Sequence, residues 1–195
     1  MNSNKNNKNN KNNKNNKNNK TRTLTTIAVM TAAAFILQLL GTVLPFKVGG
    51  FLEIEFSDLP AIIGTLSLGP AAGVVIELLK NILKCGATTT GFVGELANFV
   101  INGTFVLVIG LVYKYNKTRK GAILALLAGT LTITLSGILA NILILLPLYM
   151  PSADLSSRFA LALTVITPFN LVKGIVLSVI TFYIYKPLSR IIHNR

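Results

Sequence analysis

The chain of 195 residues is 51% hydrophobic and only 13% charged, with a formal net charge of +13. A soluble domain carries about 25% charged residues, so this composition, with its mean hydropathy of +0.60, excludes a soluble globular protein and indicates an integral membrane protein. The single cysteine, Cys85, excludes an internal disulfide and most metal frameworks, and the lone histidine, His193, stands in a basic tail.

Residues 1–22 are dominated by the triplet Lys-Asn-Asn, with lysines at positions 5, 8, 11, 14, 17 and 20. This segment has almost nothing apolar to bury, so we expect a disordered basic tail. It either attaches to anionic lipid, at up to about 1 kcal/mol per lysine near the surface, or stays solvated as a low-complexity tail. Nucleic-acid binding is not expected, because the tail has no aromatic residue to stack on a base.

Apolar runs long enough to cross a bilayer follow the tail. Leu24–Leu44, Leu96–Tyr113 and Gly121–Leu146 carry no charge, and the stretch Phe159–Tyr185 carries only Lys173. A bilayer crossing needs about 17–25 residues. Residues 59–84 contain either one kinked span or two short helices that meet at Gly69-Pro70.

The placement of basic residues favours two short helices, and therefore six spans. With six, the N-terminus, the 114–120 loop and the C-terminus share the cytoplasmic side. The external side then keeps only three basic residues, which are Lys47, Lys84 and Arg158. Five spans would place the 114–120 loop outside, against the positive-inside rule.

We therefore predict an all-α membrane protein with six transmembrane helices and both termini in the cytoplasm. The second and third helices are expected to be short, at about 11 and 15 residues, and to form a hairpin packed against the longer spans. The six-helix domain covers residues 23–190, and residues 191–195 form a second basic cytoplasmic tail.

The first helix contains two small residues, Ala28 and Ala32, four positions apart. This spacing lets another helix approach closely in lipid. The approaching helix belongs either to a partner protein or to the same bundle.

An external loop, "LPFKVGGFLEIEFSDLP", connects the first and second helices and contains Phe46, Phe51 and Phe56. The alternation in "FLEIEF" predicts a short extended segment. The loop either closes over a pocket and offers an aromatic face to a planar ligand, or keeps its aromatic residues at the headgroup level. Ser57 or Asp58 is expected to cap the second helix.

Strongly polar side chains of the spans are predicted to gather in the external half of the membrane. They are Gln38, Thr42, Glu77, Lys80, Asn81, Lys84, Glu95, Asn98, Asn102, Asn141, Asn170 and Lys173. A charge at the centre of a span costs roughly 2.5–3.5 kcal/mol, and asparagine is too short to reach the interface, so these groups need partners. Either Lys173 pairs with Glu77 or Glu95 in a structural network, or the polar residues line an outward-facing pocket for a small molecule, which we favour.

Four motifs occur in the order "LEIEFSDLPAIIGTLSLGPAAG", "ELLKN", "NILILLPLY" and "TPFNLVKG", where Thr167-Pro168 is expected to begin the last helix. In these motifs the chain resembles the riboflavin-binding S components of energy-coupling factor (ECF) transporters, over roughly residues 24–190. The resemblance implies a six-helix protein that captures riboflavin from outside. It places Asn141, Asn170 and Lys173 at the isoalloxazine end of the ligand.

Further ligand contacts are expected from the same interpretation. Gln38 and Asn98 are candidates for the ribityl hydroxyl groups, and Phe46 and Phe56 belong to the loop over the site. The resemblance also implies a separate energising module, made of a transmembrane coupling protein and two ATPases, because the chain has no GxxxxGK[ST] phosphate loop. Ala28 and Ala32 match the coupling surface of that family.

Other functions fit the sequence less well. An S component for thiamin or biotin is disfavoured by the absence of tryptophan and by the amide–amide–lysine set, which suits a flavin edge; FMN remains open as a second ligand. A membrane-embedded enzyme is disfavoured because no span contains a histidine, and a small carrier because no inverted repeat is visible. We expect no catalytic residue, no metal and no bound cofactor.

Overall fold

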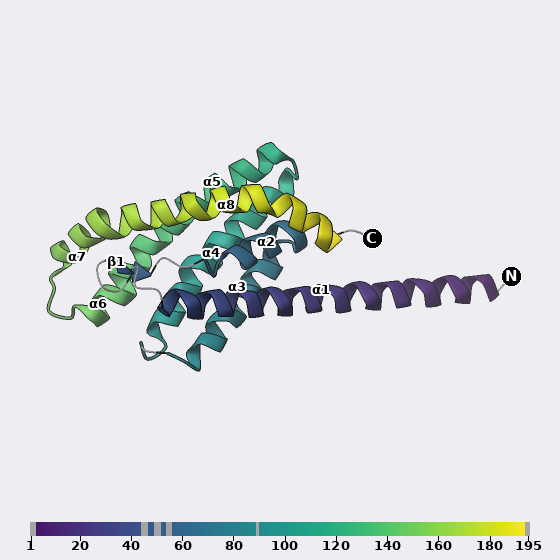
Figure 1. The fold of residues 1–195 in the computed structure, drawn as a ribbon, viewed down its shortest axis with the longest axis horizontal. Coiled ribbons are helices and arrows are strands. Elements are labelled where there is room, and N and C mark those ends of the chain that lie inside the picture. The colour runs from purple at the N-terminus through teal and green to yellow at the C-terminus, as the bar shows by residue number, and fades with distance from the viewer. Residues whose placement is uncertain (1–2, 44–46, 49–51, 54–55, 89, 194–195) are drawn as a thin grey trace.

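The structure, a computed structural model, describes residues 3–43, 47–48, 52–53, 56–88 and 90–193. Its elements in chain order are α1 (Ser3–Val43), β1 (Lys47–Val48), β2 (Leu52–Glu53), α2 (Leu59–Leu68), α3 (Pro70–Cys85), α4 (Val93–Tyr115), α5 (Arg119–Ala140), η1 (Asn141–Leu145), α6 (Leu146–Tyr149), α7 (Leu155–Leu161), η2 (Ala162–Ile166) and α8 (Thr167–His193). The segments η1 and η2 are π-helical turns that continue their neighbours without a break. The described residues thus form six helical rods (Figure 1).

Four of these rods are long and apolar enough to cross a membrane, over Lys17–Gly41, Val93–Tyr115, Arg119–Tyr149 and Leu155–Tyr185. The other two are α2, with 10 residues, and α3, with 16. This confirms the prediction of six helices of which the second and third are short.

The chain turns between α2 and α3 at Gly69, whose φ of +104° strongly favours glycine. Pro70 then occupies the first position of α3, where its missing N–H leaves no hydrogen bond unmade. The Gly-Pro pair therefore ends one helix and starts the next, as predicted.

Helix α2 lies at the centre of the bundle. All its residues from Pro60 to Ser67 are buried, and it packs against α1, α3, α4 and α8. Because longer helices surround it, ten residues suffice: its ends need not reach the two membrane surfaces, and its backbone ends are enclosed by protein rather than by lipid.

The outer surface of the bundle is apolar. Helix α5 shows this most clearly, since Leu131, Leu135 and Leu139 lie on one stripe and are 63%, 62% and 60% exposed. Soluble proteins rarely expose apolar patches of this extent. Together with the four spanning helices, the stripe identifies a multi-pass membrane protein whose outer face contacts lipid.

Both ends of the chain lie at one end of the bundle, while α6, α7 and β1 lie at the other (Figure 1). The positive-inside rule assigns the end with the two basic termini to the cytoplasm. The external end therefore holds the β1–β2 pair, an antiparallel ribbon in which Lys47 faces Glu53 and Val48 faces Leu52. This pair confirms the predicted extended segment around Leu52–Glu53.

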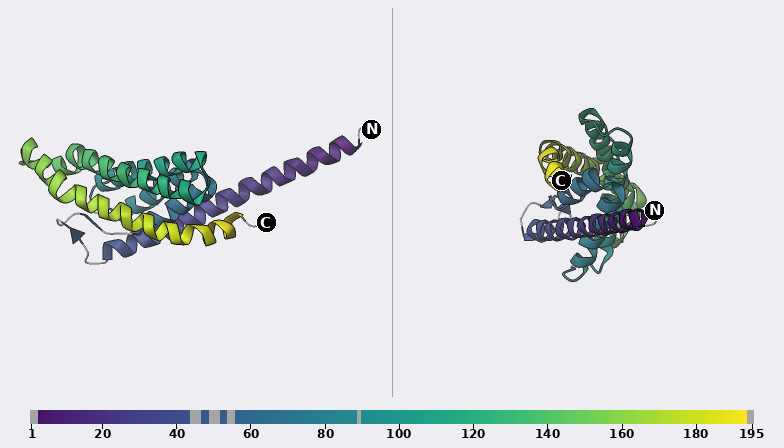
Figure 2. Two further views of the ribbon diagram at one scale, coloured as in Figure 1. Left: turned by 90° about the horizontal axis from the view of Figure 1, so that it is seen from above. Right: turned by 90° about the vertical axis from the view of Figure 1, so that its right-hand side faces the viewer.

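The N-terminal segment differs from the expected disordered tail. Helix α1 begins at Ser3, runs for 41 residues and projects well beyond the bundle at the cytoplasmic end (Figures 1 and 2). Once the apolar half of α1 has nucleated the helix, each further residue adds a hydrogen bond without the cost of a new nucleus. This cooperativity explains how the Lys-Asn-Asn repeat continues the helix.

Candidate binding site

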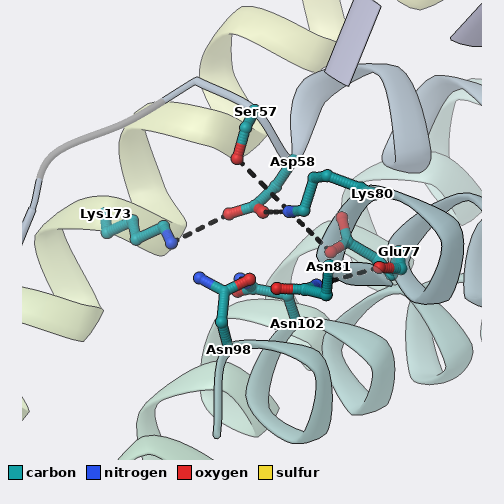
Figure 3. A network of polar contacts seen from close by, with 8 residues as sticks. All are labelled: Ser57, Asp58, Glu77, Lys80, Asn81, Asn98, Asn102 and Lys173. Atoms are coloured by element: carbon teal, nitrogen blue, oxygen red, sulfur yellow. Dashed lines mark hydrogen bonds and ion pairs between the residues drawn. The ribbon is translucent and has the colours of Figure 1, made fainter. Parts of the chain in front are cut away.

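A cluster of four charged side chains lies inside the bundle, formed by Asp58, Glu77, Lys80 and Lys173 (Figure 3). Asp58 Oδ1 is 2.7 Å from Lys80 Nζ, and Asp58 Oδ2 is 2.9 Å from Lys173 Nζ. Lys80 Nζ also lies 2.6 Å from Glu77 Oε2 and donates a hydrogen bond to Ser57 Oγ at 3.2 Å. The side chains are fully buried except that of Lys173, which is 9% exposed.

The charges of this cluster balance, with two carboxylates against two ammonium groups. Balance matters because an unpaired charge in such surroundings costs several kcal/mol. Asp58 has the central place, since it contacts a lysine of α3 and a lysine of α8 at once. It thereby joins the end of the external loop to both helices.

The structure differs in two respects from what the sequence suggested for this region. Asp58 stands at the N-cap position of α2, but its side chain makes no capping hydrogen bond. Its two oxygens lie against Lys80 and Lys173 instead (Figure 3). The buried network that was one of the two alternatives for Lys173 is present, and it contains an ion pair of Lys173 with Asp58, a residue that was not predicted as its counter-charge. Glu77 pairs with Lys80 one turn further along α3, and Glu95 accepts hydrogen bonds from the hydroxyl groups of Thr88 and Thr90.

Asn141 and Asn170 each lie against Gly137 of α5. Asn141 Nδ2 donates to the carbonyl oxygen of Gly137 at 2.7 Å. A Cβ atom at Gly137 would lie 2.5 Å from Asn170 Nδ2, so only glycine lets α8 place this amide against α5. The two asparagines are 1% and 5% exposed.

The amide groups of both asparagines are oriented by their own helices. Each donates from Nδ2 to the carbonyl four residues earlier, that of Gly137 for Asn141 and that of Ile166 for Asn170. Such back-bonding turns the side-chain oxygen away from the helix's own backbone. Asn141 Oδ1 is buried and has no hydrogen-bond partner among the described residues.

Two π-helical turns lie at this level of the bundle. Segment η1 begins at Asn141, η2 ends just before Thr167, and the two turns contact each other. Pro147 and Pro168 follow them within two residues, and each removes an N–H that an α-helix needs. Thr167 Oγ1 compensates in part by donating to the carbonyl oxygen of Ala162 at 2.8 Å.

These turns correct the prediction for the last helix. Thr167-Pro168 does not start a helix after a loop, because α8 continues η2 and α7 from Leu155. The motifs "LLPLY" and "TPFN" instead widen two neighbouring helices beside the polar residues. π-turns of this kind are frequent at functional sites.

The remaining predicted ligand residues belong to α1, α4 and the segment before α2. Gln38 is 4% exposed, and its Oε1 has no hydrogen-bond partner among the described residues. Asn98 is half-buried and accepts a hydrogen bond from Asn102 Nδ2 beside the charged cluster (Figure 3). Phe56 is 39% exposed directly before Ser57, and Phe46 lies outside the described residues.

The small residues of α1 lie on its outer surface. Ala28 and Ala32 are both exposed, whereas Ala34 on the opposite side of the helix is fully buried. The interpretation that this pair packs within the bundle is therefore wrong. Among the described residues, no group of three or more His, Cys, Asp or Glu side chains is placed to hold a metal ion.

Comparisons with known proteins agree on one family. Residues 22–185 match the family model described as "ECF transporter, substrate-specific component". The riboflavin transporter RibU of Staphylococcus aureus (strain TCH60) is 32% identical over 85% of this chain and 89% of its own length. The riboflavin transporter FmnP of Bacillus subtilis (strain 168) is 33% identical over 85% of this chain and 91% of its own length.

The fold gives the same result as the sequence. The structure superposes with a TM-score of 0.76 on a solved S component of a bacterial ECF transporter, at 30% sequence identity, over 90% of this chain and 99% of that one. The chain belongs to the substrate-specific components of ECF transporters.

Proposed function

We propose that this chain captures riboflavin at the external membrane surface and delivers it to an ECF energising module for ATP-driven uptake. The proposal rests first on the site: Asn141 and Asn170 each lie against Gly137, and Lys173 follows Asn170 by one turn of α8. Its second support is that relatives at 32% and 33% identity are riboflavin transporters.

The chemistry of the site suits the polar edge of a flavin. That edge alternates carbonyl acceptors with an imide N–H donor. Asn141 Oδ1, which has no partner among the described residues, is an acceptor for the N–H. Lys173 carries three donors, and beyond its bond to Asp58 it can donate to a ring carbonyl, a charge-assisted bond that is stronger than a neutral one.

The other ligand contacts remain as the sequence suggested them. We assign Gln38 and Asn98 to the ribityl hydroxyl groups, and the loop with Phe46 and Phe56 to the cover of the site. Thiamin and biotin present no edge of alternating acceptor, donor and acceptor opposite these residues, whereas FMN shares the flavin edge and differs only in its phosphate.

One experiment tests the proposal directly. The protein purified in detergent is expected to carry a yellow chromophore with a flavin absorption spectrum, or to quench the fluorescence of added riboflavin in a saturable way. Competition with FMN, thiamin and biotin separates the alternatives. A colourless protein that leaves riboflavin fluorescence unchanged would exclude riboflavin as its ligand.

Asn170→Ala is expected to weaken riboflavin binding by about ten- to a hundredfold, because an unpaired polar group in a buried site costs about 1–3 kcal/mol. Fluorescence titration measures the change. Asn116→Ala, in the exposed α4–α5 connection at the cytoplasmic end, is the matched control and should bind as the wild type does. An Asn170→Ala protein with affinity within twofold of the wild type would remove Asn170 from the site.

Gly137→Ala is expected to weaken riboflavin binding while the protein still folds. The added Cβ would stand 2.5 Å from Asn170 Nδ2 and 2.9 Å from its Cγ, so the amide must move out of its present position. Titration of the purified variant, with its melting temperature as a control for folding, measures the effect. Unchanged affinity would show that the position of the Asn170 amide is unimportant.

Delivery requires a partner that hydrolyses ATP, and we propose a module of a transmembrane coupling protein and two ATPases. Ala28 and Ala32 form the docking face on α1. Their exposure and their four-residue spacing favour close approach by a helix of the coupling protein.

A further inference from the structure

The turn between α4 and α5 carries a dense group of cations at the cytoplasmic end of the bundle. Lys114, Lys117, Arg119 and Lys120 all belong to this short segment, and all four are exposed. Helix α4 ends at Tyr115 and α5 begins at Arg119, so the cations stand at the boundary between two spans and the cytoplasm. Among the described residues, none of the four pairs with a carboxylate.

The acidic residues of the chain all lie elsewhere. They are Glu53, Glu55, Asp58, Glu77, Glu95 and Asp154. The segments at the cytoplasmic end, which are residues 1–22, 114–120 and 186–195, contain no acidic side chain. Orientation in the membrane depends on lysine and arginine, and acidic residues contribute little to it. The positive-inside rule therefore accounts for the cations but not for the absence of acidic residues, whereas a surface that binds an anionic partner needs both.

The turn holds its cations in a fixed conformation. Thr118 Oγ1 accepts a hydrogen bond from the backbone N–H of Gly121 at 3.1 Å and donates one to Asn116 Oδ1 at 2.8 Å. A Cβ atom at Gly121 would lie 1.8 Å from the carbonyl oxygen of Asn116, so this close approach requires glycine. The cations of the connection therefore stay close to the ends of the two spans.

Two exposed tyrosines indicate the depth of the turn in the membrane. Tyr115 directly follows Lys114 and is 90% exposed, and Tyr183, near the cytoplasmic end of the span in α8, is 74% exposed. Tyrosine is enriched at the membrane–water interface, where its ring lies at the level of the lipid headgroups. The cations of the turn are therefore at the headgroup level as well.

We propose that the α4–α5 turn binds anionic phospholipid headgroups of the cytoplasmic leaflet. A group of four or more basic residues directly cytoplasmic of a span is typical of such binding, and lysine and arginine form charge-assisted hydrogen bonds with phosphate oxygens. Lipid is favoured over an acidic protein surface because the proposed docking face belongs to α1, which packs against α2 and α3, whereas the turn joins α4 and α5. The inference goes beyond vitamin capture and does not depend on which ligand the protein carries.

The test compares an anionic with a zwitterionic lipid. The detergent-purified protein is mixed with equal amounts of phosphatidylglycerol and phosphatidylcholine, and the lipids that remain bound are identified by native mass spectrometry. The wild type is expected to retain phosphatidylglycerol in at least roughly tenfold preference. Lys117→Gln combined with Lys120→Gln should lower this preference at least about fivefold, while Lys114 and Arg119 still keep the turn in the cytoplasm.

A second pair of lysines provides the matched control. Lys5→Gln combined with Lys8→Gln removes the same charge from the part of α1 that projects beyond the bundle (Figure 2). These positions precede Lys17, where the first span begins, by more than about 13 Å of helix, and charges are screened over about 8 Å at physiological salt. The lipid preference of this variant should stay within about twofold of that of the wild type. Equal losses in both variants would overturn the assignment to the turn and indicate attraction by net charge alone.

The remaining outcomes are equally decisive. Equal retention of the two lipids by the wild type would overturn the proposal, and if Lys117→Gln/Lys120→Gln then copurified with less of the energising module, the partner of the turn would be an acidic protein surface. The melting temperature of each variant controls for folding. Should the double variant unfold, Lys117→Gln alone gives the same comparison, with an expected loss of at least about twofold.

Discussion

Asp58→Asn is expected to destabilise the protein severely, by about 3–5 kcal/mol, the usual cost of breaking a buried ion pair from one side. The substitution keeps the shape of the side chain and removes its charge. The carboxylate that lies 2.9 Å from Lys173 Nζ and 2.7 Å from Lys80 Nζ would be lost, and the buried cluster would then hold two ammonium groups against the one carboxylate of Glu77. The melting temperature of the detergent-purified protein should fall by roughly 10 °C or more.

A double variant distinguishes lost charge balance from lost shape. Asp58→Asn combined with Lys173→Met restores a balanced cluster of Glu77 and Lys80, and should recover most of the lost stability. It should not recover riboflavin binding, because Lys173 is one of the proposed ligand contacts. Recovery of neither would mean that Asp58 acts through its shape, and recovery of both would exclude Lys173 from the site.

A second carboxylate serves as the matched control. Asp154 caps α7 by accepting a hydrogen bond from the backbone N–H of Ser157, and it lies exposed at the external end. Asp154→Asn removes the same charge from a solvated position, where an asparagine still caps the helix. Its melting temperature should stay close to that of the wild type, whereas a fall as large as that of Asp58→Asn would indicate a general sensitivity to loss of acidic charge.

The fold was predictable because each of its determinants is local in the sequence. The apolar runs gave the long helices, Gly69-Pro70 gave the break between α2 and α3, and the basic residues of the 114–120 loop decided between five and six spans. None of these signals depends on which helices contact each other. The extension of α1 to Ser3 does not follow from composition, because composition shows only that this polar segment has little apolar surface to bury. A polar segment can still continue a helix that the adjacent apolar segment has nucleated.

The polar residues inside the spans could be picked out from the sequence, whereas their pairings could not. Asn141, Asn170 and Lys173 stood out as polar groups in apolar runs, and the structure brings the two asparagines to Gly137. Asp58 was interpreted as a cap because aspartate before a helix usually is one. Only the packing of α2 between α3 and α8 reveals that two lysines reach it, and sequence spacing contains no such information.

The sequence itself contains one indication that Asp58 pairs with lysines. Helix α2 is wholly apolar or small and carries no charge of its own, so the two lysines of the neighbouring spans had to find partners at its ends. Asp58 is the acidic residue at the external end of α2, on the side where Lys80 and Lys173 were placed. All three residues are expected at the same depth in the membrane, and this shared depth indicates that Asp58 pairs with Lys80 and Lys173.

Ala28→Trp is expected to abolish riboflavin uptake by cells while leaving riboflavin binding by the purified protein unchanged. Both Ala28 and Ala32 are exposed on α1, so an indole ring there projects into lipid and should not disturb the bundle. It would, however, keep a partner helix from the close approach that small residues permit. Uptake of labelled riboflavin and copurification of the energising module measure the effect.

Val29→Trp provides the matched control, because Val29 is 61% exposed on the same turn of α1 but points about 100° away from Ala28. It adds the same ring at the same depth in the membrane, on a face that already carries a branched side chain. Uptake by this variant should remain close to that of the wild type. Equal loss of uptake in both variants would mean that the whole exposed surface of α1, rather than its small-residue face, contacts the coupling protein. Loss of riboflavin binding by Ala28→Trp would show instead that the alanine supports the bundle itself.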